Sequence, residues 1–528
     1  MTEPTIKDAI ISGTTALGIE LGSTRIKAVL IGPDHRPIAT GMHDWENQFV
    51  ERMWTYSIDE VHEGLQRCFA SLAADVRAQY GVELESVGMM CVSAMMHGYI
   101  ALDADGNLLV PFRTWRNTTT GPAAAELIDL FGYNIPLRWS IAHLRQAMLD
   151  GEAHVPHVAH VMTLGAYVHW KLTGENVTGV GDASGMFPVD TKTHTYDATM
   201  ARKFDELVAA AGHTWRFADV MPRTLVAGEP AGVLTPEGAA LLDPTGTFRP
   251  GVPLCPPEGD ADTGMVATNS VTQRTGNVSA GTSVFELIVL EHELQNVYPE
   301  IDMLATPAGD LAALIHSNNG SSELDAWVGV FGEMAAALGV AATPAQLYEA
   351  AYRASLDGDP DCGGLLAYNY LAGEPVTGLE EGRPLIVRTP DSTLNLANFM
   401  RAQLFALFAV LRVGKELLEP EGVRIDRMFG HGGIFKTAGV AQRYLALALD
   451  VPVSVGDLAG EGGAWGAALL AAYARDNGGL TLSDYLNQRV FADAGLTTIT
   501  PDPAEVAGYD AYMKRYMDGL AMEHAATK

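Results

Sequence analysis

The sequence predicts an α/β protein built from two lobes. Segments with the alternating period of strands and segments with the period of helices follow one another along most of the chain. A break from Asp243 to Asp260, with five prolines and three glycines, interrupts this pattern. The hairpin pattern that opens the chain returns after the break, about 260 residues later. We therefore expect a first lobe over residues 1–255 and a second lobe over residues 256–528.

Size, charge and cysteine content limit what the chain can be. A chain of 528 residues is too long to fold around a single hydrophobic core. Its composition, with 48% hydrophobic and 19% charged residues, is typical of globular proteins. The formal net charge of −30 argues against nucleic-acid and membrane partners, which require clustered lysine and arginine. Cys68, Cys91, Cys255 and Cys362 are widely spaced, which predicts reduced thiols. Without a signal peptide or an apolar run of ~20 residues, a cytoplasmic protein is expected.

The opening hairpin carries an acidic residue, Glu20, followed by the turn Gly22-Ser23-Thr24 and then by Lys27. Backbone N–H groups of a glycine turn, assisted by hydroxyl groups, can bind phosphate oxygens. Glu20 would hold Mg²⁺, directly or through water. The alternative is a polar surface hairpin, because short glycine motifs are weak evidence.

A buried strand farther along the chain emerges at Met96-His97-Gly98. In parallel α/β sheets, ligands bind beyond the carboxyl ends of the strands, so His97 is a candidate to bond a polyol hydroxyl. The alternative is a structural histidine. A later helix that begins near Leu164 is expected to end at Gly174, which suits a C-terminal cap.

Asp260 follows a glycine at the start of a predicted helix, in the stretch EGDADTG. A carboxylate in this place points into whatever cleft the helix end faces, and it could take the proton from an attacking hydroxyl. Two other roles stay open. Asp260 could cap the helix, or it could form half of a metal site together with Asp262.

The second lobe repeats the glycine-hydroxyl hairpin at Gly281-Thr282. Later, the loop HGGIFKT leads into a helix N-terminus, which suits the phosphates, ribose or base of a nucleotide. The residues of this loop that would touch the nucleotide are Gly432, Gly433 and Lys436.

Two further stretches of the second half are helical. The small-residue stretch EGGAWGAA, residues 461–468, reads as a helix that a neighbour or a flat ring approaches closely. The C-terminal part, residues 491–528, is expected to form a docking helix or an assembly surface. The helical spacing of Tyr509, Tyr512 and Tyr516 favours docking onto the body.

Taken in order, these parts resemble the FGGY family of carbohydrate kinases, which belong to the actin-like, ribonuclease-H-fold ATPase superfamily. The resemblance covers roughly residues 16–474 and includes LTGE (172–175) followed by GDASGMFPVD (181–190). It implies a two-lobed fold with the active site in the interlobe cleft. It also implies ATP and Mg²⁺ as cofactors and a small-molecule sugar as substrate. A homodimer is one assembly that it allows.

The resemblance also assigns roles to residues. It places Gly22, Ser23 and Thr24 on the β- and γ-phosphates from the first lobe and Gly281 and Thr282 from the second. Asp260 matches the general base, and together with Glu20 it would bind the metal ion. Gly432 and Gly433 match the adenosine loop, and Glu461 belongs to the adenine-side helix. Met96, His97 and Gly98 look like the sugar-contact motif of xylulokinases, with Asn117 as a further sugar contact.

Three positions depart from the family pattern. Glu20 stands where the family has aspartate, and the added methylene moves the carboxylate by roughly 1 Å, a misplacement that can cost ~100-fold in rate. TWRNTTT (114–120) replaces Trp-Asn-Asp-x-Arg, so Asn117 replaces an acidic sugar contact. Phe435 and Lys436 stand where small polar residues and Arg or Asn are common.

The sequence therefore predicts an ATP-dependent kinase that phosphorylates a terminal hydroxyl of a ketopentose such as xylulose. Two alternatives stay open: a kinase of the same family for ribulose, erythrulose, glycerol or another polyol, and an ATP- and sugar-binding sensor without turnover. A metal-dependent hydrolase built on Asp260 and Asp262 lacks histidine or glutamate partners nearby.

Overall fold

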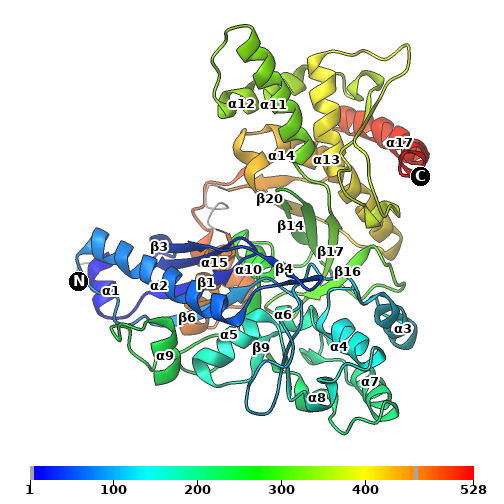
Figure 1. The fold of residues 1–528 in the computed structure, drawn as a ribbon. Coiled ribbons are helices and arrows are strands. Elements are labelled where there is room, and N and C mark those ends of the chain that lie inside the picture. The colour runs from blue at the N-terminus through cyan, green and yellow to red at the C-terminus, as the bar shows by residue number, and fades with distance from the viewer. Residues whose placement is uncertain (1–4, 457–461) are drawn as a thin grey trace. The chain divides into compact units, whose positions relative to one another are not determined.

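The computed structural model describes residues 5–456 and 462–528. The chain divides into two compact units, each built on a β-sheet with helices around it (Figure 1). The first unit holds Met1–Val271, Met303–Ala312 and Glu461–Asp493, and the second holds Thr272–Asp302, Ala313–Gly460 and Ala494–Lys528. The assignment of lobes to residues 1–255 and 256–528 stays a prediction.

The first unit contains a five-stranded sheet in the order β13-β6-β1-β2-β3. Its strands are β1 (Ala16–Leu21), β2 (Arg25–Ile31), β3 (Pro37–Asp44), β6 (Met89–Ala94) and β13 (Glu258–Gly259). β1 and β2 form an antiparallel hairpin, whereas β1, β6 and β13 run parallel. The three parallel strands therefore end at one edge of the sheet.

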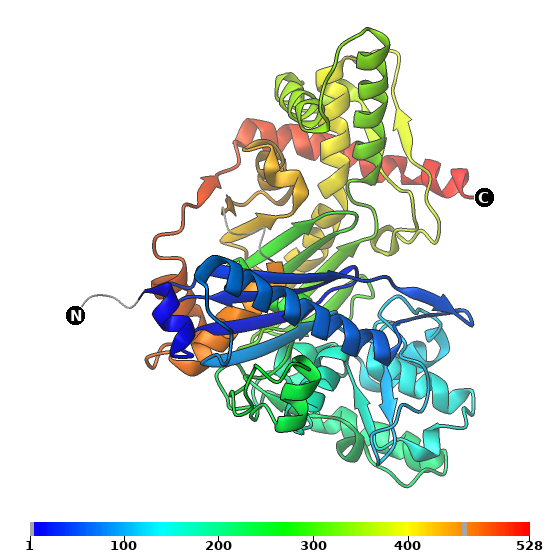
Figure 2. The ribbon, with the colours of Figure 1, turned by 60° about the vertical axis from the view of Figure 1, so that its left-hand side comes forward.

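The two faces of this sheet are covered by different helices. Leu17, Ile19 and Leu21 point to one face, where they join a core that includes side chains of α2 (Ile58–Tyr80). The residues between them in β1 point to the other face, where α15 (Gly462–Arg475) packs against β1. Figure 2 shows α2 in front of the strands and α15 behind them.

Shorter elements complete the first unit. α5 (Leu164–Thr173) ends as predicted at Gly174, which caps the helix with a φ of +78°. The other elements are α1 (Ile6–Ile11), β4 (Gln48–Val50), β5 (Met53–Thr55), β7 (Ile100–Leu102), α3 (Gly121–Phe131), α4 (Ser140–Leu149), β8 (His160–Met162), β9 (Val177–Gly179), α6 (Val180–Ser184), β10 (Val189–Asp190), β11 (Thr195–Tyr196), α7 (Ala198–Ala210), α8 (Phe217–Val220), β12 (Arg223–Leu225), α9 (Pro236–Leu242), α10 (Asp260–Ala267) and α16 (Leu482–Tyr485).

The second unit holds most of a seven-stranded sheet in the order β16-β17-β15-β14-β20-β21-β22, of which part of β16 and the start of β17 are counted with the first unit. Its strands are β14 (Thr275–Ala280), β15 (Val284–Val289), β16 (Ile301–Ala305), β17 (Leu311–Ser317), β20 (Arg427–His431), β21 (Val453–Val455) and β22 (Thr497–Ile499). β14 pairs antiparallel with β15 and parallel with β20, just as β1 pairs with β2 and β6. The recurrence seen in the sequence is therefore a recurrence of topology.

Helices α11, α12 and α13 lie side by side in this unit (Figure 1). Its remaining elements are α11 (Ser322–Ala337), α12 (Pro344–Ala354), β18 (Leu366–Tyr368), β19 (Leu385–Val387), α13 (Leu396–Leu418), the short 3₁₀ helix η6 (Gly433–Lys436), α14 (Val440–Leu449) and α17 (Pro503–Ala526). Within the described residues, one helix, Leu396–Glu421, is long and apolar enough to cross a membrane, but most of its apolar part is buried inside the protein.

The C-terminal helix α17 docks onto the second unit, as the tyrosine spacing predicts. Tyr509, Tyr512 and Tyr516 are fully buried. The Tyr509 hydroxyl donates to the carbonyl of Phe405 on α13, and the Tyr512 hydroxyl donates to the carbonyl of Ala367 on β18. The same face of the helix thus supplies both apolar area and hydrogen bonds.

Candidate active site

The carboxyl ends of β1, β6 and β13 bring together three of the predicted site segments. The register aligns Leu21 with Ala94 and Gly259 with Ala94, so the next residues of the three strands lie side by side. Glu20 lies one residue before this edge, and Asp260 lies one residue beyond it. Ligands of parallel α/β sheets bind at such an edge.

Asp260 is the first residue of α10, and its carboxylate is held by backbone groups. Oδ1 accepts hydrogen bonds from the N–H of Met96 (3.3 Å) and from that of Ala261 (3.0 Å). Burial raises the pKa of Asp260 to about 6, and these hydrogen bonds oppose the rise. The capping contact at this helix end is made by Asp262, which accepts from Gly259 N–H at 3.2 Å. Gly259 is the N-cap residue, so Asp260 occupies the first helical position and not the cap.

Glu20 points to the same face of the sheet as Gly18. Its Oε2 accepts a hydrogen bond from the backbone N–H of Ala464, at the start of α15. Burial and, next, the charge of Asp260 raise the pKa of Glu20 to about 7, against the opposing effects of the Ala464 N–H and the charge of Lys27. Lys27 lies directly opposite Glu20 in the hairpin. A carboxyl with these neighbours changes charge near neutral pH.

Aromatic side chains hold the turn Gly22-Ser23-Thr24 in place. Trp45 Nε1 donates to the carbonyl of Gly22 (2.7 Å), and the hydroxyl of Tyr56 donates to the carbonyl of Ser23 (2.5 Å). Trp115 Nε1 donates to the Ser23 hydroxyl at 3.2 Å. The turn is thus a braced element, unlike the free surface hairpin that the sequence left as an alternative.

His97 follows β6 in the left-handed region, with a φ of +67°, and Gly98 follows with a φ of +82°. Backbone strain in a residue other than glycine is common at functional sites. The His97 ring is buried, and its Nδ1 lies 3.0 Å from the carbonyl oxygen of Gly185. Met96 contributes its N–H to Asp260. The sugar-binding roles of these residues stay predictions.

Asn117 is already occupied by backbone groups. Its Oδ1 accepts from the N–H of Trp54 (2.9 Å), and its Nδ2 donates to the carbonyl groups of Trp54 (2.7 Å) and Thr114 (3.0 Å). The side chain is 3% exposed. These hydrogen bonds join β5 to the segment after β7, which is a structural role for Asn117. Its role as a sugar contact stays a prediction.

Three further buried carboxyl groups, those of Asp182, Glu258 and Asp262, lie near Asp260. Of these, the sequence analysis named only Asp262 as a candidate. Glu258 accepts from the N–H of Asp182 (2.9 Å), while Asp182 accepts from the hydroxyls of Thr163 and Thr178. Burial raises the pKa of Asp182 to about 6 and raises the pKa of Glu258 and of Asp262 well above their usual range. Only the fold brings Asp182 near the EGDADTG segment.

The small residues of α15 permit a close approach to β1 and α10. A Cβ atom on Gly463 would lie 2.8 Å from Glu20 Oε1, and one on Gly466 would lie 1.9 Å from the carbonyl oxygen of Thr263. These contacts correspond to the close packing that the sequence predicts for this helix. Glu461 lies outside the described residues.

In the second unit, the hairpin turn at Gly281-Thr282 meets the glycine loop that follows β20. A Cβ on Gly432, which has a φ of +112°, would lie 2.2 Å from the carbonyl oxygen of Ala280. The loop Asn318–Ser321 clamps the turn, since Gly320 N–H donates to Thr282 O (2.8 Å). Because β14 and β20 are parallel, both glycine segments lie at the carboxyl ends of neighbouring strands.

A cavity of about 500 Å³ opens beside these segments. Among the predicted nucleotide residues, Gly281, Gly433 and Lys436 line it. Its other lining residues come from α11, α12 and neighbouring positions: Ala280, Ser321, Asp325, Pro344, Ala345, Tyr348, Glu349, Tyr352, Ile434 and Thr437. Thr282 and Gly432 are not in the lining, and the Phe435 ring packs against Gly430. The cavity has the size and mixed walls of a small-molecule site.

Both halves of the chain match known protein-family models. Residues 15–266 match the N-terminal domain, and residues 276–475 the C-terminal domain, of the FGGY family of carbohydrate kinases. The chain belongs to this family. The FGGY kinases among solved structures confirm the two-lobed actin-like fold that the sequence predicts.

The relatives of this FGGY sugar kinase are distant. The xylulose kinase of Haemophilus influenzae is 22% identical over 444 residues, which are 81% of this chain and 83% of that protein. The crystal structure of xylulose kinase from Rhodospirillum rubrum has a TM-score of 0.78 at 20% identity, covering 97% of this chain and 99% of that one. That of gluconate kinase from Lactobacillus acidophilus has a TM-score of 0.77 at 16% identity, covering 96% and 97%. Such identities establish the fold and leave the substrate open.

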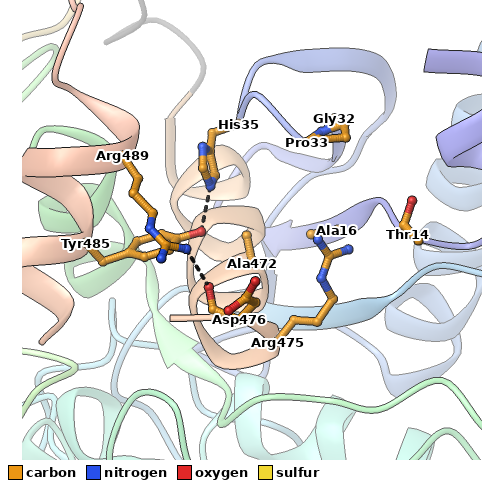
Figure 3. A pocket seen from close by; sticks show the side chains of 10 residues that line it. All are labelled: Thr14, Ala16, Gly32, Pro33, His35, Ala472, Arg475, Asp476, Tyr485 and Arg489. Atoms are coloured by element: carbon orange, nitrogen blue, oxygen red, sulfur yellow. Dashed lines mark hydrogen bonds between the residues drawn. The ribbon is translucent and has the colours of Figure 1, made fainter. Parts of the chain in front are cut away.

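A second cavity of this FGGY chain, about 100 Å³ in volume, lies at the start of β1 (Figure 3). His35 Nε2 and the Tyr485 hydroxyl lie 2.6 Å apart on its wall, and Arg489 donates to the carbonyl oxygen of Asp476. Arg475 projects from the C-terminal end of α15. Since Ala16 borders this cavity and Glu20 lies near the other end of β1, the cavity is separate from the candidate active site.

Proposed function

We propose that this FGGY sugar kinase transfers the γ-phosphate of ATP to a terminal hydroxyl of a ketopentose such as xylulose. The observation that carries the proposal is the placement of Asp260 at the ends of parallel strands, next to Met96 and near Glu20. A carboxylate with a pKa of about 6 is ionised at neutral pH and is a stronger base than an ordinary aspartate. The xylulose kinases among the relatives favour a ketopentose.

In this proposal, Asp260 accepts the proton of the substrate hydroxyl through the carboxylate oxygen Oδ2, since Oδ1 is already bonded to two backbone N–H groups. Those two bonds fix the orientation of the carboxylate before the substrate arrives. Phosphoryl transfer depends mainly on such positioning and on charge stabilisation. His97 and Gly98, set in left-handed conformations beside Met96, would orient the sugar hydroxyls.

The residues present fit a magnesium ion that is shared with a nucleotide. Within the described residues, no three His, Cys, Asp or Glu side chains gather as a metal cage. Magnesium is usually bound by one or two carboxylates, with waters and phosphates completing its shell. Glu20 and Asp260 supply such a pair, because the charge of one raises the pKa of the other. Bound there, Mg²⁺ would neutralise the charge of the phosphates.

The nucleotide residues are proposed in both units. In the first, the N–H groups and hydroxyls of Gly22, Ser23 and Thr24 would bind phosphate oxygens, with Lys27 nearby. In the second, Gly281 and Thr282 would do so, and the cavity beside Gly433 and Lys436 would take the nucleoside. The braced turn and the 500 Å³ cavity support these assignments. A cytoplasmic location and a homodimer stay predictions.

The experiment is ADP release with Mg·ATP against a panel of ketoses, aldoses and polyols, with Asp260→Asn run in parallel. A sugar-dependent rate that falls by ~10²–10⁴-fold in the variant supports the kinase. The sugar with the highest kcat/KM then decides between xylulose and the alternatives ribulose, erythrulose and glycerol. A low rate that no sugar stimulates, equal in the variant, would instead favour a sensor.

A further inference from the structure

Arg116 is an exposed arginine whose guanidinium lies over two indole rings. Its guanidinium carbon lies 5.4 Å from the ring centroid of Trp54 and 5.2 Å from that of Trp115. Both distances are within the range of cation–π contact. Contact with two aromatic faces restricts the side chain, and the N–H donors of the guanidinium stay available to a ligand.

The frame that carries Arg116 is tied to the phosphate turn. Next to it along the chain, Trp115 donates to the Ser23 hydroxyl, and Asn117 bonds the backbone of Trp54 on both its N–H and its carbonyl. The arginine is thus fixed from both neighbours. Tyr56, which donates to the carbonyl of Ser23, also interacts with the charge of Arg116. Burial raises the pKa of Tyr56 to about 12, and the positive charge of Arg116 opposes that rise.

The Arg116 guanidinium has no ion pair and no side-chain hydrogen bond among the described residues. This contrasts with Arg25, which directly follows the same turn in the chain and pairs with Asp44 at 2.6 Å. In a chain with a net charge of −30, a fixed and unpaired cation beside a phosphate turn is conspicuous.

We propose that Arg116 binds an oxyanion of the reactants, through two N–H donors of its planar guanidinium. The proposal rests on the proposed kinase site. Carboxylates and phosphates are the groups whose geometry matches the fork of arginine, and a stacked arginine loses little freedom when it binds them. The oxyanion has two sources: the triphosphate of ATP, or a carboxylate on an acidic sugar such as an aldonate.

Calorimetric titration of the full-length protein distinguishes these sources without requiring turnover. The probes are the non-hydrolysable ATP analogue AMP-PNP with Mg²⁺, and D-xylonate. We expect Arg116→Gln to weaken binding of one of the two by 10- to 100-fold, the usual effect of losing a charge-assisted bidentate contact. Loss of AMP-PNP affinity alone assigns the triphosphate, and loss of xylonate affinity alone assigns an acidic sugar.

Arg25→Gln is the matched control, because it removes the same charge beside the same turn but from a paired side chain. Its affinities for both probes should stay within twofold of the wild type. Arg116→Lys should recover only part of the lost affinity, since an ammonium group keeps the charge but offers no planar fork. Unchanged thermal stability of all three variants excludes a folding effect.

The proposal is overturned if Arg116→Gln binds both probes as the wild type does, or if Arg25→Gln loses affinity equally. It is also overturned if the wild type binds neither probe. The kinase proposal fails on a different result, namely the absence of turnover that depends on sugar and on Asp260.

Discussion

The backbone N–H of Ala464 donates a hydrogen bond of 2.9 Å to Oε2 of Glu20, a residue 444 positions away in the sequence. The longer side chain of glutamate thus reaches the start of α15, against which β1 packs closely. A Cβ on Gly18 would lie 2.1 Å from the carbonyl oxygen of Ala464, so no larger residue would allow this approach. Glutamate in place of the family's aspartate therefore has a partner that holds it.

We predict that Glu20→Asp lowers kcat/KM for Mg·ATP by ~100-fold, although aspartate is the residue that the family pattern has. The shortened side chain would withdraw its carboxylate by roughly 1 Å from Ala464 and from the metal position. Steady-state kinetics over a range of Mg²⁺ concentrations would measure the effect.

Glu20→Gln separates the two roles of the side chain. Its amide oxygen still accepts from Ala464 N–H, but it carries no charge for a cation. We expect folding to be retained and the Mg²⁺ requirement to rise more than in Glu20→Asp. Equal Mg²⁺ requirements in both variants and the wild type would show that Glu20 does not hold the ion.

The pH dependence of turnover should show an acidic limb near neutrality. Burial raises the pKa of Asp260 to about 6 and that of Glu20 to about 7, so each stays protonated to a higher pH than usual. Both groups act as anions in the proposed mechanism. The logarithm of kcat/KM should therefore rise between about pH 5 and pH 7 and level off above pH 7.

Glu20→Gln removes the higher of the two ionisations and should shift this limb toward pH 6. Profiles of kcat/KM for the wild type and the variant, measured with one sugar at a low concentration of free Mg²⁺ so that the ion does not hold the carboxyl groups ionised, test this expectation. A limb near pH 4, where ordinary carboxyl groups ionise, would contradict the assignment of these two residues.

Gly466→Ala should destabilise the protein, because the new methyl group would lie 1.9 Å from the carbonyl oxygen of Thr263. Overpacking of this kind typically costs about 1–3 kcal/mol. Gly264→Ala, on the helix that carries Thr263, meets no atom within 4 Å and serves as the matched control. Urea unfolding of both variants measures the difference, and equal midpoints would mean that α15 does not need its glycines.

Gly433→Leu should weaken nucleotide binding without loss of stability. Gly433 lines the 500 Å³ cavity, and a Cβ there meets no atom within 4 Å, so the larger side chain would extend into free space. We expect at least a tenfold rise in the Kd for ATP, measured by calorimetry. Gly329→Leu, in α11 and outside the cavity lining, has the same open surroundings and should bind ATP normally.

Local patterns in the sequence predicted those features that depend on neighbouring residues. The capped end of α5 at Gly174, the buried tyrosine face of α17 and the paired hairpins at Gly22 and Gly281 all follow from spacing and turn chemistry. The capping role of Asp262 was missed, because Asp260 and Asp262 are equally plausible caps until the helix start is known to the residue.

The remaining features depend on contacts between distant segments. Asp182 could not be placed near Glu258, nor Arg116 over the rings of Trp54 and Trp115, because no local period relates those positions. The hydrogen bond from Ala464 N–H to Glu20 likewise joins positions that no local pattern relates.

By itself, the sequence determined the fold class and the family and supplied the candidate residues of the site, since hydrophobic period, turn residues and motif order are local properties of the chain. Only the tertiary structure decided which groups are neighbours. Burial and charge at those contacts set the pKa of Glu20 and Asp260, and the bracing of Ser23 and Arg116 comes from side chains brought there by folding.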